Sequence, residues 1–280
     1  IPTAVGMAIA ERHLAERFNR KGFPVVDHFT YTICGDGDLM EGVSSEAASL
    51  AGHLKLGRLI VLYDSNDVSL DGNLSLAYSD DTKKRFESYG WQVISVKDGN
   101  DLNKIKAAIR MAQSDLTRPS LIEIKTTIGY GAPSVEGTHK AHSDPLGPEE
   151  IKRAKQNYNW TYNEPFYVPE AVYKDFASIQ IEGEEKEKAW NKLLIRYKQS
   201  YPELYTEFSR ILNRDFPMNW EAKLPSYNFT DQLATRVASS QAINNLAYSF
   251  TELIGGSADL DASTRTRLIA FDDFQAQTYS

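Results

Sequence analysis

The chain has 280 residues, of which 41% are hydrophobic and 25% are charged, so its size predicts one large domain or two ordinary ones. Its net charge of -7 argues against nucleic acid as a partner, and no apolar stretch is long enough to span a bilayer. The single cysteine, Cys34, excludes an intrachain disulfide and a multi-cysteine zinc site, and we expect it to be buried in an apolar strand. This cysteine usage favours a reducing compartment, and we expect the cytoplasm.

Short apolar strands alternate with helices over the first 125 residues. Helical spacing of apolar residues and runs of β-branched and aromatic residues predict helices over 4–18, 44–56, 81–89 and 102–113 and strands over 29–34, 59–63, 91–96 and 120–125. Such alternation is typical of βαβ units, so we predict an α/β fold whose parallel sheet is covered by helices on both faces. Ligands of such sheets collect at the carboxyl ends of the strands.

The second half of the chain has a different character. A glycine-rich loop over 128–148 contains His139 and His142, and a charged helical region extends from there to Leu212. A new pattern follows, with a helix over 234–248 and a short strand that ends at Ile254. We expect a first domain over 1–212, a linker over 213–229 and the start of a second α/β domain over 230–280. Both ends of the chain look cut, because it lacks an initiator methionine and stops without a terminal signal.

One short motif stands where the first strand gives way to a helix. Gly35-Asp36-Gly37 is weak by itself, because Asp-Gly is also a common hairpin turn. The residues that follow lead into a helix instead of a returning strand. Asn66 lies at the end of the next strand, with 28 residues between it and Gly37. This separation matches one βαβ unit, so Asp36 and Asn66 are expected at neighbouring strand ends.

A carboxylate and an amide oxygen at one sheet edge suit a hard cation. Magnesium prefers six oxygen ligands and rarely takes all of them from protein, so diphosphate oxygens and water could complete the shell. The glycines beside Asp36 allow the backbone to approach phosphates closely, and a helix beginning after Gly37 would turn its N-terminus toward an anion. The residues therefore predict a site for a magnesium diphosphate.

Gly-Asp-Gly followed by Asn after 25 to 30 residues is the thiamine diphosphate fingerprint. More specifically, the chain resembles the transketolase family in four runs, which are Gly35-Asp36-Gly37-Asp38-Leu39-Met40-Glu41-Gly42, Ser49-Leu50-Ala51-Gly52-His53-Leu54-Lys55-Leu56-Gly57, Tyr89-Gly90-Trp91 and Gly255-Gly256-Ser257-Ala258-Asp259-Leu260. The resemblance extends from Val5 to about Ser263. It implies the thiamine diphosphate-binding fold, with the diphosphate-binding domain over 1–212 and the beginning of the pyrimidine-binding domain over 230–280.

The resemblance also implies roles for single residues at the cofactor. Asp36, Asn66 and the backbone carbonyl of Val68 resemble the family's ligands of Mg²⁺ or Ca²⁺, although isoleucine is expected at the third position. Gly37 resembles the residue whose N–H meets the diphosphate, and Ile128 resembles an apolar contact of the thiazolium ring.

His142 resembles the family's active-site histidine, which lies near the reacting carbonyl, the substrate and the cofactor. The family pattern His-Gly-Ala-Pro is here His142-Ser143-Asp144-Pro145. The carboxylate of Asp144 could shift the charge near that histidine, so the departure affects the group that would handle a proton.

The same resemblance implies roles for two further pairs of residues, one at the substrate and one at a subunit interface. Arg236 and Ser263 resemble the residues that hold the sugar phosphate, and a guanidinium with a hydroxyl suits a phosphate monoester. Glu41 and Glu46 match positions at the interface of a homodimer, where carboxylates are thought to link the two cofactors. Taken without the resemblance, Arg236 would be an ordinary surface residue, and the two glutamates would be residues favoured by a helix dipole.

The activity implied is that of a transketolase in the pentose phosphate pathway, which transfers a two-carbon ketol unit from a ketose phosphate to an aldose phosphate. The glutamate that activates the cofactor would lie beyond Ser280, so we predict that this segment alone is inactive. A sister enzyme, such as dihydroxyacetone synthase or deoxyxylulose phosphate synthase, is one alternative; Arg236 with Ser263 and the loop Gly129-Tyr130-Gly131 favour transketolase. A catalytically silent binding or assembly subunit is the other.

Overall fold

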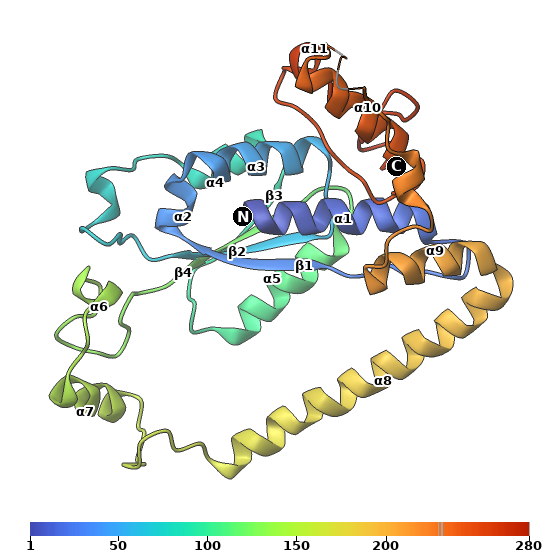
Figure 1. The fold of residues 1–280 in the computed structure, drawn as a ribbon. Helices are drawn as coiled ribbons and strands as arrows, with labels where there is room; N and C mark the ends of the chain where they lie inside the picture. Colours follow the sequence, from blue (N-terminus) through green and yellow to red (C-terminus); the bar gives the residue numbers. More distant parts are fainter. Residues whose placement is uncertain (229, 231, 280) are drawn as a thin grey trace. The chain divides into compact units, whose positions relative to one another are not determined.

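A computed structural model of the chain describes residues 1–228, 230 and 232–279; the predicted linker and second domain end at Phe229 and Ser280, which lie outside these ranges. The chain forms two compact units. The first consists of Ile1–Arg12 and His28–Ile179, and the second of His13–Asp27 and Gln180–Ser280. Helix α1 (Pro2–Phe18) contributes its beginning to the first unit and its end to the second (Figure 1).

The first unit contains a four-stranded parallel sheet in the order β1-β2-β4-β3. Its strands are β1 (Thr30–Gly35), β2 (Leu59–Ser65), β3 (Gln92–Val96) and β4 (Ser120–Lys125). The helices between them are α2 (Asp36–Met40), α3 (Gly42–His53), α4 (Thr82–Ser88) and α5 (Leu102–Ser114), with a 3-10 turn, η1, at Leu74–Leu76. The predicted α/β fold with a parallel sheet is thereby confirmed.

Helices cover both faces of this sheet. Figure 1 shows α5 on one face and α3 with α4 on the other. On the α5 face, Ala108 and Ala112 pack with Ile60 and Ile122 of the two central strands. Each of these four residues is at most 4% exposed. Asp101 caps the start of helix α5, and its side chain accepts hydrogen bonds from two backbone N–H groups of the first turn. These apolar contacts fix the central strands, whose carboxyl ends carry the candidate site.

Two of the sequence runs quoted above, 49–57 and 89–91, pack against each other beside helix α3. The indole N–H of Trp91 donates to the carbonyl of Ala48 at 2.8 Å, and its ring stands edge-on to Phe86 at 5.1 Å. A Cβ on Gly52 would lie 1.8 Å from the carbonyl oxygen of Tyr89, so only glycine permits this approach. The run around Gly52 and the run Tyr89-Gly90-Trp91 are therefore two sides of one packing contact.

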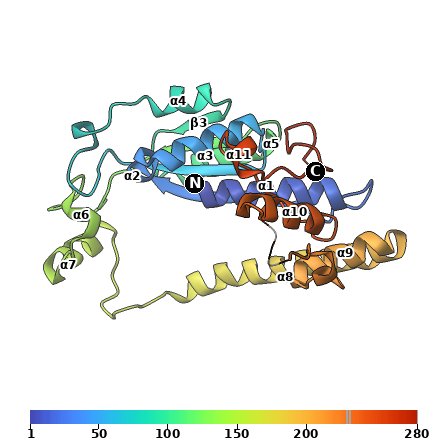
Figure 2. The same ribbon diagram turned by 45° about the horizontal axis from the view of Figure 1, so that its top comes forward.

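After β4 the chain passes into the loop over 126–147, which contains the short helix α6 (Lys140–Ser143), and then into α7 (Pro148–Asn157). Figures 1 and 2 show this segment at the carboxyl edge of the sheet, where α2 also begins. The long helix α8 (Glu170–Ser200) then passes from the first unit into the second.

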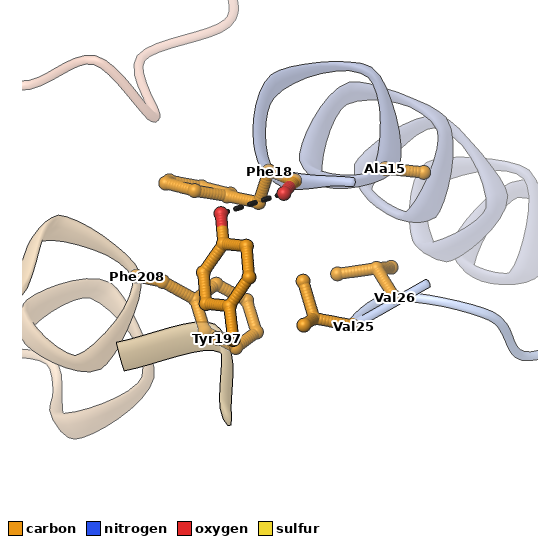
Figure 3. Close-up of a cluster of buried hydrophobic side chains, with 6 residues drawn as sticks. All are labelled: Ala15, Phe18, Val25, Val26, Tyr197 and Phe208. Carbon is orange, nitrogen blue, oxygen red and sulfur yellow. Dashed lines mark hydrogen bonds between the residues drawn. The ribbon is translucent and has the colours of Figure 1, made fainter. Parts of the chain in front are cut away.

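The second unit contains the end of α1, the rest of α8 and α9 (Pro202–Asn213), followed by η2 (Trp220–Lys223), α10 (Thr235–Ala247) and α11 (Asp261–Thr264). Figure 3 shows its core, which is formed by Ala15, Phe18, Val25, Val26, Tyr197 and Phe208. The rings of Phe18 and Phe208 are 5.0 Å apart, and the hydroxyl of Tyr197 donates to the carbonyl of Phe18 at 2.6 Å. That bond satisfies a carbonyl at the end of α1, which has no partner within its own helix.

Several element predictions need correction. The predicted strand ending at Ile254 is wrong, because residues 250–253 form a turn in which the N–H of Leu253 donates to the carbonyl of Phe250 at 3.0 Å. A strand needs a neighbour for its backbone hydrogen bonds, and the described part of the second unit has no strand for it to join. The helix predicted over 44–56 ends at His53, because Lys55 has a left-handed backbone with φ of 52°.

None of the described helices combines the length and apolar character needed to cross a membrane.

Candidate functional site

Asp36 lies where the two neighbouring strands end. The pairing of Gly35 with Asp64 places Asp36, the residue after β1, beside the last residue of β2. Its side chain is 2% exposed, and its Oδ2 accepts the N–H groups of Asn66 at 3.1 Å and Asp67 at 2.9 Å. The sheet register thus brings Asp36 and the Asn66 turn together.

The second oxygen of Asp36 has a side-chain partner. The hydroxyl of Tyr63, on the buried strand β2, donates to Oδ1. Burial raises the pKa of Tyr63, and the hydrogen bond to Asp36 raises it further, so the phenol keeps its proton and remains a donor at neutral pH. A carboxylate has about four lone-pair positions, and the three donors leave one of them, on Oδ1, for a further partner.

The turn after β2 supplies two more oxygen atoms that could bind a cation, one from the side chain of Asn66 and one from the backbone of Val68. The side-chain oxygen of Asn66 accepts the N–H of Val68 at 3.1 Å, and Val68 forms a β-bridge with Asn73. An amide oxygen that accepts one hydrogen bond keeps a second lone pair. A carboxylate, an amide oxygen and a carbonyl oxygen form a donor set that fits a hard divalent cation.

The first helix after β1 starts at a different residue from the one predicted. Helix α2 begins at Asp36 itself, not after Gly37, and it has only five residues. The side chain of Asp38 accepts the N–H of Gly35 at 2.8 Å, which stabilises this tight start. Gly37, Glu41 and Glu46 are all exposed, with Glu41 at the junction of α2 and α3.

The loop after β4 is held by bonds within itself and to α7. Glu136 accepts the N–H of Gly131 at 3.0 Å, and Asn157 donates to the carbonyl of Gly131 at 2.8 Å. The hydroxyl of Tyr158 donates to the carbonyl of Tyr130. Buried Glu150 accepts the N–H of Ser134 at 2.7 Å, and this bond lowers the pKa of its carboxyl group, so the group stays ionised.

This loop carries two of the predicted site residues, Ile128 and His142. Ile128 is half-buried and its carbonyl accepts the N–H of Gly137 at 2.8 Å. His142 is exposed on α6, and Ser143 and Asp144 beside it are exposed as well. Within the described residues, no hydrogen bond or ion pair joins His142 to Asp36.

Residues 1–217 match the sequence family described as "Transketolase, thiamine diphosphate binding domain". The chain belongs to this family. It is 54% identical to the transketolase of Geobacillus stearothermophilus and 52% identical to that of Bacillus subtilis, in each case over 100% of this chain and 42% of the relative. The chain therefore spans about 42% of the length of these transketolases.

Solved transketolases share the fold. Transketolase from Leishmania mexicana matches with a TM-score of 0.95 and 40% identity over 99% of this chain and 42% of that one. A Pichia stipitis transketolase in complex with sedoheptulose 7-phosphate matches with a TM-score of 0.94 and 41% identity over 98% of this chain and 41% of that one. The parallel sheet and its helices are thus those of a transketolase thiamine diphosphate binding domain.

Sequence reasoning missed three residues around Asp36 and the Asn66 turn. Tyr63 contacts Asp36 directly, while Ser65 and Lys125 lie beside the Asn66 turn. A signal existed for Tyr63, because a tyrosine in a buried strand needs a hydrogen-bond partner near its hydroxyl. No such signal existed for Lys125, which reaches the site only because β4 pairs with β2.

Arg236 and Ser263 lie in the second unit and are both exposed. Arg236 is in the first turn of α10, and Ser263 is in α11. Asn244 of α10 donates to the carbonyl of Arg267 at 3.0 Å and accepts the N–H of Ile269 at 2.7 Å. These two bonds hold α10 against the segment that follows α11.

Proposed function

We propose that the full-length protein containing this chain is a transketolase, which transfers a two-carbon ketol unit from a ketose phosphate to an aldose phosphate. The observation that carries the proposal is the buried carboxylate of Asp36 bonded to the Asn66 turn within a transketolase family domain. The relative from Pichia stipitis was solved with sedoheptulose 7-phosphate, a ketose phosphate. Because the chain spans about 42% of the length of these transketolases, the start of the first domain and most of the second would come from the rest of the protein.

We infer that the site takes thiamine diphosphate with Mg²⁺ or Ca²⁺. Asp36, Asn66 and the carbonyl of Val68 would hold the cation, because they are oxygen donors and Asp36 keeps an acceptor position on Oδ1. The N–H of Gly37 would donate to the diphosphate. Thiamine diphosphate supplies, when bound, the carbanion chemistry that breaks and forms the carbon–carbon bond.

The remaining residues would bind and orient. Ile128 would give the thiazolium ring an apolar contact, and His142 would hold or move a proton at the reacting carbonyl oxygen. Glu41 and Glu46 would lie at the interface of a homodimer.

We also propose three segments of the chain, which are the diphosphate-binding domain over 1–212, the linker over 213–229 and the pyrimidine-binding domain from 230 onward.

The test is a transfer assay on the full-length protein with fructose 6-phosphate as the donor and an aldose phosphate as the acceptor. We expect transfer that requires both thiamine diphosphate and a divalent cation, and a dimer in sedimentation. Cofactor binding without transfer to the aldose phosphate would favour a sister enzyme. An intact chain of 31.5 kDa that binds no cofactor would favour the silent assembly subunit.

We predict that Arg236 and Ser263 bind the phosphate of the sugar. Replacing Arg236 by Ala in the full-length protein should lower kcat/KM for phosphorylated substrates about ten- to a hundredfold, because charge-assisted hydrogen bonds to phosphate are lost. Hydroxypyruvate, which carries no phosphate, should be used almost as well as before. Arg236→Lys should restore part of the loss, since lysine provides the charge without the planar fork. Equal losses on both kinds of donor would assign Arg236 to the fold or the cofactor instead.

A further inference from the structure

The turn after β2 contains, between its two proposed cation ligands, a residue in an unusual conformation. Asp67 lies between Asn66 and Val68, and its φ of 62° is in the left-handed region that favours glycine. Its backbone N–H donates to Oδ2 of Asp36 at 2.9 Å. The left-handed conformation therefore belongs to the arrangement that brings the turn to the buried carboxylate.

A lysine on the neighbouring strand contacts this turn. The ammonium of Lys125 lies 3.2 Å from Oδ1 of Asp67 and donates to Oγ of Ser65 at 2.7 Å. Ser65 is 1% exposed and ends β2, and Lys125 ends β4 directly opposite it. One ammonium thus joins the ends of two central strands to the side chain of the left-handed residue.

We propose that Lys125 is a positioning residue, which holds Asp67 in its left-handed conformation and so presents Asn66 and Val68 to the cofactor's cation. The inference rests on the proposed function, because it assigns these two residues to the cation. An exposed ion pair alone stabilises little. Here the ammonium is also anchored by a buried hydroxyl, and groups that orient metal ligands influence metal affinity strongly.

The proposal predicts how a glycine at position 67 changes the need for Lys125. If Lys125 acts by holding the backbone of Asp67, then a glycine at position 67 makes Lys125 dispensable, because glycine adopts this conformation without help. If Lys125 instead acts on the cofactor directly, glycine at position 67 changes nothing. The double variant Lys125→Met with Asp67→Gly separates these cases.

The experiment uses the full-length protein and measures the dissociation constant of thiamine diphosphate by calorimetry at saturating Mg²⁺. Lys125→Met should weaken binding about five- to tenfold, as expected for a lost ion pair at a metal-orienting position. Asp67→Gly and the double variant should both bind within about twofold of wild type. Lys84→Met, which breaks the exposed ion pair of Lys84 with Asp81 at 2.8 Å, is the matched control and should bind like wild type.

A second readout needs no cofactor. Amide exchange of the peptide over 64–74 in the cofactor-free protein should be faster in Lys125→Met than in wild type, and normal in the double variant. Undiminished cofactor binding by Lys125→Met, or a loss that persists in the double variant, would overturn the positioning role. If wild type itself binds no thiamine diphosphate, the proposed function fails, while the exchange measurement still decides whether Lys125 holds the turn.

Discussion

Replacing Asp36 by Ala in the full-length protein is expected to weaken the binding of thiamine diphosphate with Mg²⁺ about a hundredfold or more. Asp36 is the single carboxylate among the three proposed ligands, and its Oδ2 also holds the turn that carries the other two through the N–H groups of Asn66 and Asp67. The change therefore removes one ligand and releases the segment of the others. Calorimetric titration of the variant and the wild type measures the effect.

The design includes a check on folding, because Ala also leaves the buried hydroxyl of Tyr63 without its acceptor. Asp36→Asn has nearly the same shape but cannot accept all three hydrogen bonds, so it should lose cofactor binding with a smaller drop in thermal stability. Asp71→Ala, which removes an exposed carboxylate from the turn after Asn66, is the control and should bind like wild type. Tight binding of Mg²⁺ without the diphosphate, or undiminished cofactor binding by Asp36→Ala, would contradict the assignment.

The second large effect is expected in the core of the second unit. Tyr197 is fully buried among Phe18, Val25 and Phe208, so Tyr197→Ala should lower the free energy of unfolding by about 3–5 kcal/mol. The loss combines the removed aromatic contacts, the cavity left behind and the unpaired carbonyl of Phe18 (Figure 3). Urea denaturation of the full-length protein measures it. Tyr173→Ala, which truncates a tyrosine of the same helix that is 61% exposed, should change this free energy by less than about 0.5 kcal/mol.

Tyr197→Phe separates the hydroxyl from the ring. It should cost about 1 kcal/mol, the typical net value of one hydrogen bond. Burial raises the pKa of Tyr197 above the ordinary value of 10.0. The unfolded chain therefore loses this proton at a lower pH than the folded chain, so the stabilising effect is complete below pH 10 and declines as the pH rises above it. Tyr197→Phe should reduce this alkaline loss of stability; an identical alkaline profile in the variant would show that other groups cause it.

The sequence by itself determined the four strands of the first unit and the longer helices between them. Apolar residues at helical spacing and β-branched runs are local signals, and they placed each strand of the parallel sheet within about two residues of its observed bounds. The separation of Asp36 and Asn66 was also readable, because one βαβ unit places consecutive strand ends at one edge of the sheet. Predictions based on short apolar runs without a neighbour were less secure, as the turn that replaces the strand at Ile254 illustrates.

The tertiary structure alone decided which side chains support Asp36 and the Asn66 turn. The sequence shows that Tyr63 needs a hydrogen-bond partner but not that the partner is Asp36. Lys125 has no local signal at all, and it reaches Asp67 only because β4 lies beside β2 although β3 separates them in the chain. Likewise, Gly52 is required by the carbonyl of Tyr89, a residue 37 positions away. Such partners are fixed by strand order and helix packing, which depend on the burial of the whole unit and not on the periodicity of any one segment.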